Sequence, residues 1–192
     1  MIAPVCVMLP DMFAVAAIGS ALFLGAVMTV GDFVWEYFGL RHSVWSGVAH
    51  GAVMCLCIGA VTGAYAGRAA AGIVAGPFIG AFAAAAFYAI APTLGWGAML
   101  PAWMLFWICF ALLQHVLRRS ELFNRALGRG VLAALLSGLA FYAISGIWTR
   151  PAPGGPNYLV HFVYWSFAFL PGFLVLFVGR PSPRSSRPPS SV

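Results

Sequence analysis

Six apolar stretches follow one another along this chain, and each is long enough to cross a lipid bilayer. A helix needs about 20 mainly apolar residues to span the hydrocarbon. Short breaks rich in Gly, Pro, Arg or Ser separate the stretches, which cover residues 12–39, 43–66, 70–93, 97–117, 128–148 and 157–179. The pattern predicts an all-α, polytopic membrane bundle of six transmembrane helices.

The composition excludes the soluble alternatives. Of the 192 residues, 62% are hydrophobic and only 7% are charged, whereas a soluble domain is about half apolar and a quarter charged. A chain of this size could not bury such an excess in one core. The net charge of +6 comes from ten arginines, but they lie at the ends of the apolar stretches. We therefore expect the lipid bilayer as the partner of this chain, and no nucleic acid.

The arginines also predict the orientation of the chain in the membrane. On one side of the predicted spans lie eight of them: Arg68, Arg118, Arg119, Arg125, Arg129, Arg180, Arg184 and Arg187. The other side has only Arg41 and Arg150. Because loops with more positive charge stay in the cytoplasm, both termini are expected to be cytoplasmic. The absence of lysine from the sequence is typical of a GC-rich bacterial genome, which favours the bacterial inner membrane.

Two parts of the chain are expected to behave differently. Residues 1–180 form the predicted six-helix transmembrane domain. Residues 181–192 contain almost only Pro, Ser and Arg, and such a segment cannot bury enough apolar surface to fold. We expect a disordered cytoplasmic tail there.

Small residues recur at every fourth position along the second and third stretches. The glycines of this pattern are Gly47, Gly51, Gly59, Gly63, Gly67, Gly72, Gly76 and Gly80. Such ridges let two membrane helices approach closely. The fifth stretch has a similar pattern, so spans two, three and five are expected to form the tightly packed centre of the bundle. The same ridges could dock another membrane protein or a second copy of the chain.

Several polar side chains are predicted at one depth. A charged group inside a span costs roughly 2.5–3.5 kcal/mol near its centre, so it is a candidate functional residue. At 1.5 Å per residue, Asp32, His50 and His161 lie roughly 8–10 Å outward of the middle of their spans. Ser145 falls at a similar depth, and Glu36 lies one turn above Asp32. If these faces converge, they form a polar pocket that opens to the periplasm.

The residue types leave four kinds of chemistry open for this layer. His50, His161 and Asp32 are sufficient ligands for a divalent metal with an open position for water. The same side chains could bind a solute or relay a proton, because histidine titrates near neutrality. Ser145 could act as a nucleophile activated by a histidine that Asp32 orients. Alternatively, Asp32 and His50 only hydrogen-bond between helices and stabilise the bundle.

We therefore expect a small transport or solute-binding protein with a site at Asp32, Glu36, His50, Ser145 and His161. Two alternatives remain open at this point. One is a membrane-embedded hydrolase, with or without a metal. The other is a structural accessory subunit of a membrane complex.

Overall fold

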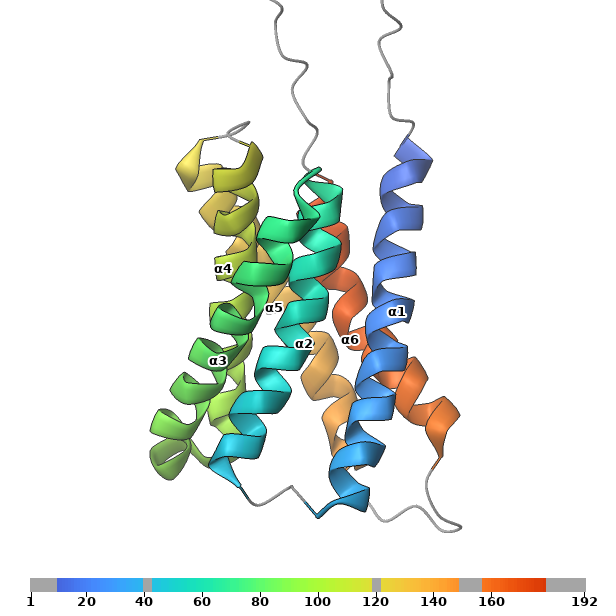
Figure 1. The fold of residues 1–192 in the computed structure, drawn as a ribbon, viewed down its shortest axis with the longest axis vertical. Helices are drawn as coiled ribbons and strands as arrows, with labels where there is room; N and C mark the ends of the chain where they lie inside the picture. Colours follow the sequence, from blue (N-terminus) through green and yellow to red (C-terminus); the bar gives the residue numbers. More distant parts are fainter. Residues whose placement is uncertain (1–9, 40–42, 119–121, 149–156, 179–192) are drawn as a thin grey trace, which may run out of the picture.

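The computed structural model describes residues 10–39, 43–118, 122–148 and 157–178. These residues form an all-helical bundle without strands. Its elements are α1 (Pro10–Tyr37), α2 (Val44–Tyr65), α3 (Ala69–Leu94), the 3-10 turn η2 (Gly95–Ala98), α4 (Met99–Arg118), α5 (Phe123–Trp148) and α6 (Tyr158–Phe177). Successive helices run in opposite directions, so α1 begins and α6 ends at the upper end of Figure 1. The predicted tail at 181–192 lies outside the described residues.

The helices are long and apolar enough for a membrane. Five helical stretches in the described part of the chain meet that requirement: Met12–Tyr37, Val44–Tyr65, Ala69–Arg118, Phe123–Ile144 and Tyr158–Phe177. The third of these has 50 residues and contains α3, η2 and α4. At its middle, Gly95 has a φ of 53°, which lies in the left-handed region that glycine adopts without strain.

The helix ends agree with the apolar stretches to within two residues, apart from one. The fifth helix begins at Phe123, five residues before the predicted start at 128. Its first turn carries Asn124 and Arg125, which are exposed. A helix can extend beyond the hydrocarbon into the polar interface. The apolar stretch therefore indicates the membrane-embedded part of a helix, and the helix itself can begin earlier.

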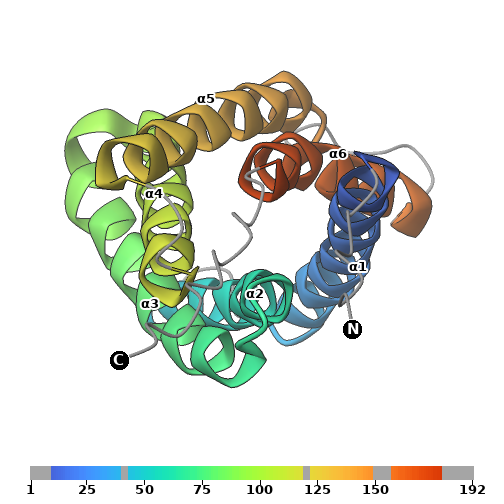
Figure 2. The ribbon, with the colours of Figure 1, turned by 90° about the horizontal axis from the view of Figure 1, so that it is seen from above.

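Seen from above, the helices form a closed circuit in which each helix contacts the one before and the one after it, and α1 contacts α6 (Figure 2). A further, smaller contact joins α2 to α4. The most extensive contacts join α2 to α3 and α1 to α6, and the contact between α1 and α2 is the sparsest of the circuit. The first helix therefore packs chiefly against the last one. This pairing brings residues more than a hundred positions apart into one site.

The glycine pattern unites α2 and α3. A Cβ atom on Gly59 would overlap the carbonyl oxygen of Gly72, and one on Gly80 would overlap the carbonyl oxygen of Gly51. Both ridges therefore face each other within the chain, where the two backbones touch. Gly67 does not belong to this ridge. It has a φ of 71° and open space around it, because it forms the turn after α2.

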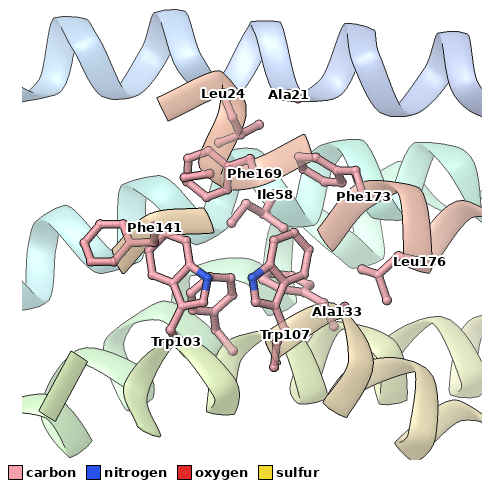
Figure 3. Packing of buried hydrophobic residues seen from close by; sticks show 14 of the residues in the cluster. Ala21, Leu24, Ile58, Trp103, Trp107, Ala133, Phe141, Phe169, Phe173 and Leu176 are labelled. Carbon is pink, nitrogen blue, oxygen red and sulfur yellow. The ribbon is translucent and has the colours of Figure 1, made fainter. Parts of the chain in front are cut away.

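The prediction that spans two, three and five form the centre of the bundle is wrong for spans two and three. Helices α2 and α3 form a tight pair on one side, while the interior is filled by large aromatic side chains from α4, α5 and α6 (Figure 3). The fully buried ones are Phe106, Trp107, Phe110, Phe141, Phe169, Phe173 and Phe177. Gly130 and Gly138 of α5 lie in its contact with α4: a Cβ atom on Gly130 would lie 2.8 Å from the Cα of Ile108. Small residues thus mark close helix pairs, whereas bulky residues fill the centre.

Polar contacts at the upper end of the bundle tie helix ends together. The Tyr65 hydroxyl donates to the carbonyl oxygen of Phe177 at 2.5 Å, and the Arg129 guanidinium donates to the carbonyl oxygen of Leu176 at 2.8 Å. Arg118 donates to the carbonyl oxygen of Tyr65 and lies 4.4 Å above its ring. Cations near the last carbonyls of a helix stabilise its negative end. These bonds connect α2, α4, α5 and α6.

Candidate functional site

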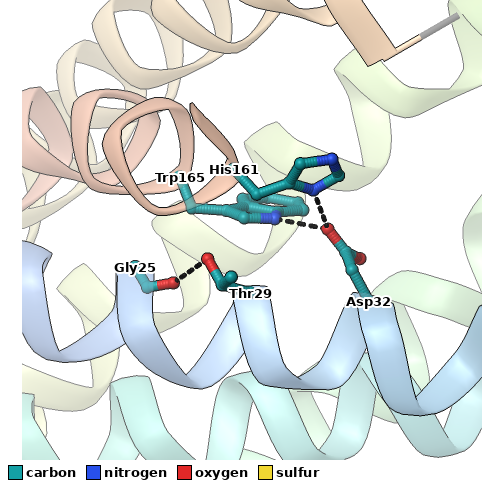
Figure 4. A network of polar contacts seen from close by, with 5 residues as sticks. All are labelled: Gly25, Thr29, Asp32, His161 and Trp165. Atoms are coloured by element: carbon teal, nitrogen blue, oxygen red, sulfur yellow. Dashed lines mark hydrogen bonds and ion pairs between the residues drawn. The ribbon is translucent and has the colours of Figure 1, made fainter. Parts of the chain in front are cut away.

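Asp32 is the centre of a polar network between α1 and α6 (Figure 4). Its Oδ2 atom accepts a hydrogen bond from Trp165 Nε1 at 2.7 Å and lies 3.3 Å from His161 Nδ1. His161 and Trp165 are four residues apart, so they lie on one face of α6. The carboxylate therefore joins the first helix to the last one through two different side chains.

The Asp32 and His161 side chains remain partly accessible. Each has about a quarter of its surface exposed, 24% for Asp32 and 25% for His161. The ring of Phe33 lies 5.1 Å from the imidazole of His161, which restricts the movement of that ring. An imidazole and a carboxylate at this separation can share a proton or receive one from outside.

His50 lies beside this network without joining it. Its ring meets that of Trp35 edge to face, with centroids 5.0 Å apart, and Gly31 leaves room for it on α1. It packs against α1 at Gly31, the residue before Asp32 in the chain. The structure therefore brings Asp32 and His161 together, and His50 approaches them from α2.

A cavity of about 250 Å³ opens on the other side of His50. It lies among α2, α3, α4 and α6, toward the lower end of the bundle in Figure 1. Small residues border it on α2 and α3, namely Gly47, Gly51, Gly80, Ala83 and Ala84. Ligand sites are usually mainly apolar cavities with a few polar groups, and here the polar groups come from His50, Tyr88 and the indoles.

Trp165 connects the cavity to the polar network. Its side chain borders the cavity, while its Nε1–H bonds to Asp32. Trp165 was not among the site residues predicted from the sequence. Its position four residues after His161, on the same helical face, is the signal that could have found it. The aromatic residues Tyr88 and Trp96, which also border the cavity, offer no such signal.

For two other predicted site residues, Glu36 and Ser145, the structure gives only their positions. Glu36 lies on the same helix as Asp32, and its side chain is exposed. Ser145 lies in α5, but its side chain is outside the part of the structure that is described. The buried serine of α5 is Ser137. It accepts from Trp103 Nε1 at 2.9 Å and donates to the carbonyl oxygen of Ala168 at 2.6 Å, so it stabilises the packing of three helices.

The described residues bring no three His, Cys, Asp or Glu side chains together in a way that could hold a metal ion. Asp32 and His161 supply two such groups. A catalytic zinc needs three protein ligands.

Comparison with family models, with curated proteins and with solved structures gives no match for this chain. Its function is therefore argued from the geometry of the bundle and the chemistry of the site.

Proposed function

We propose that this chain is a multi-pass membrane protein that binds and transports a small solute at the lower end of the bundle. The observation that carries this proposal is the double role of Trp165. It borders the cavity and donates to the partly exposed carboxylate of Asp32. A solute in the cavity would therefore sense the charge state of Asp32, and the Asp32–His161 pair could couple its binding to a proton.

The proposed topology has six crossings of the bacterial inner membrane and cytoplasmic termini. Division of the 50-residue stretch Ala69–Arg118 at η2 supports six crossings. The described arginines near helix ends, Arg68, Arg118, Arg125 and Arg129, support the orientation. The cavity would then open toward the periplasm.

Reporter fusions test this orientation. We expect green fluorescent protein fused after Val192 to fluoresce, because it would fold in the cytoplasm. Alkaline phosphatase inserted in the segment 150–156 is expected to be active, because it would reach the oxidising periplasm. The reverse pattern in both fusions would contradict the proposed topology.

Filling the cavity tests solute binding. Ala84 borders the cavity, so Ala84→Leu is expected to abolish the rise in melting temperature that bound solutes give the native protein. A ligand at 100 times its Kd stabilises by about 2.7 kcal/mol. The measurement is a thermal-shift screen of small amphiphilic solutes, with the protein in lipid nanodiscs.

The neighbouring substitution Ala85→Leu is the matched control. Ala85 is exposed on α3, so the same bulk is added outside the cavity and the thermal shifts should remain. A solute that stabilises the native protein and both variants equally would bind elsewhere. A screen without any stabilising solute would reject the proposal.

A structural accessory subunit is the second candidate. It is favoured by the bonds of Asp32 to α6, which join two helices whether or not a solute is present. The glycine ridges do not favour it, because α2 and α3 occupy them with each other. Nothing among the described side chains supports the hydrolase, because no serine there contacts a histidine.

A further inference from the structure

The wall of the cavity is unusually rich in aromatic rings. Six aromatic side chains border it, namely Phe87, Tyr88, Trp96, Trp103, Phe106 and Trp165. They come from α3, η2, α4 and α6, so the rings approach from several directions. Among the described residues that border the cavity there is no Arg, Asp or Glu. An apolar enclosure of this kind favours a ligand that interacts with π-systems.

A negative charge lies at the edge of one of these rings. The Asp32 carboxylate accepts the Nε1–H of Trp165, and Asp32 itself does not border the cavity. Such a bond draws the indole proton toward the carboxylate and leaves the ring more electron-rich. The face of an indole attracts cations. Asp32 adds a direct Coulomb attraction, which the low dielectric of the surroundings strengthens.

The groups around Asp32 do not cancel this preference. The imidazole of His161 contacts Asp32 from α6, on the network side rather than in the cavity wall. His50 borders the cavity from α2. No arginine borders the cavity among the described residues, so no permanently positive side chain opposes a cation there.

We propose that the cavity binds a small lipophilic organic cation, such as an aryl-substituted quaternary ammonium ion. The aromatic wall and the carboxylate that is hydrogen-bonded to Trp165 are the features that favour this cation. This inference rests on the proposed solute-binding function and specifies its substrate class. A quaternary ammonium ion has no hydrogen-bond donors, so it cannot form hydrogen bonds with polar groups. Aromatic rings around it provide favourable cation–π contacts instead.

Two probes of the same shape separate the charge of a ligand from its size. Phenyltrimethylammonium carries a quaternary nitrogen where tert-butylbenzene has a carbon, so the two differ chiefly in charge. Their binding is measured through quenching of tryptophan fluorescence at pH 8. The full chain is held in nanodiscs of phosphatidylcholine, and empty nanodiscs are subtracted. We expect phenyltrimethylammonium to bind at least about tenfold more tightly, which corresponds to favourable contacts with one or two aromatic rings.

The variant Asp32→Asn tests the source of this preference. Asparagine has the same shape and can still accept from Trp165, so the helix pair is kept while the charge is lost. We expect it to weaken phenyltrimethylammonium binding at least about fivefold and to leave tert-butylbenzene binding unchanged.

The outcomes separate this inference from the function on which it rests. Equal or tighter binding of tert-butylbenzene would overturn the cation preference and leave a solute-binding cavity. An unchanged affinity for phenyltrimethylammonium in folded Asp32→Asn would also overturn it. Failure of both probes, together with an unproductive thermal-shift screen, would reject the solute-binding function itself.

Discussion

The substitution Gly59→Leu is expected to destabilise the bundle by about 3 kcal/mol, the upper end of the usual cost of overpacking. A Cβ atom at Gly59 would overlap the carbonyl oxygen of Gly72 and lie 3.0 Å from the Cα of Gly76. These are backbone atoms of α3, and they cannot move aside as the end of a flexible side chain could. The two helices must separate, so the contact along the whole ridge is weakened.

Unfolding of the purified protein by sodium dodecyl sulfate, followed by circular dichroism and tryptophan fluorescence, measures this loss. Gly128→Leu is the matched control, because Gly128 is an exposed helical glycine of α5 with open space at its Cβ position. Leucine there should leave the stability unchanged or raise it slightly. An equal loss in both variants would show that the glycines matter through helix flexibility and not through contact.

We expect Phe169→Ala to cost about 3 kcal/mol, the lower end of the range for a buried aromatic residue. Phe169 is fully buried, and its ring lies 5.6 Å from those of Trp103 and Trp165. Alanine would leave an empty space among these rings. The value is near the lower end because the unfolded reference in a membrane is already apolar, so lost packing contributes and transfer from water does not.

Phe167→Ala provides the comparison on the same helix. Phe167 is 53% exposed, so lipid chains can occupy the space that its ring leaves. The substitution is expected to change the free energy of unfolding by less than about 0.5 kcal/mol. The same detergent titration applies. If both phenylalanines cost the same, the orientation of α6 described above would be wrong.

The positions of the helices could be read from the sequence because the bilayer fixes how long an apolar helix must be. What lay beyond this reasoning is which helix neighbours which. Phe167 and Phe169 are the same residue type two positions apart, yet one is exposed and the other is buried. Hydrophobicity cannot separate them, because the lipid and the interior of the bundle are both apolar.

The same limit explains the error about the centre. The small residues correctly indicate close contact between two helices, but they carry no information about where the pair lies. The buried centre depends on large side chains of α4, α5 and α6, such as Trp107 and Phe141. These residues look in the sequence like any lipid-facing aromatic.

The candidate site was predicted in part for a related reason. Intramembrane charge pointed to Asp32 and His161, because such groups need partners. Their depths agreed, and the structure brings them together. Trp165 could have been inferred from its place one turn after His161, but its bond to Asp32 depends on α6 lying beside α1. The cavity could not be foreseen, since residues from α2, α3, α4 and α6 border it.

The pairing of α1 with α6 has a consequence for how this protein is made. Ribosomes deliver the first helix long before the last one, whereas α2 and α3 can associate as soon as both have emerged. During that interval Asp32 has neither His161 nor Trp165 as a partner. Until α6 arrives, we expect its carboxylate to be accommodated by the translocon, the lipid interface or a chaperone. A nascent chain that stops before α6 therefore lacks both of these partners for its intramembrane carboxylate.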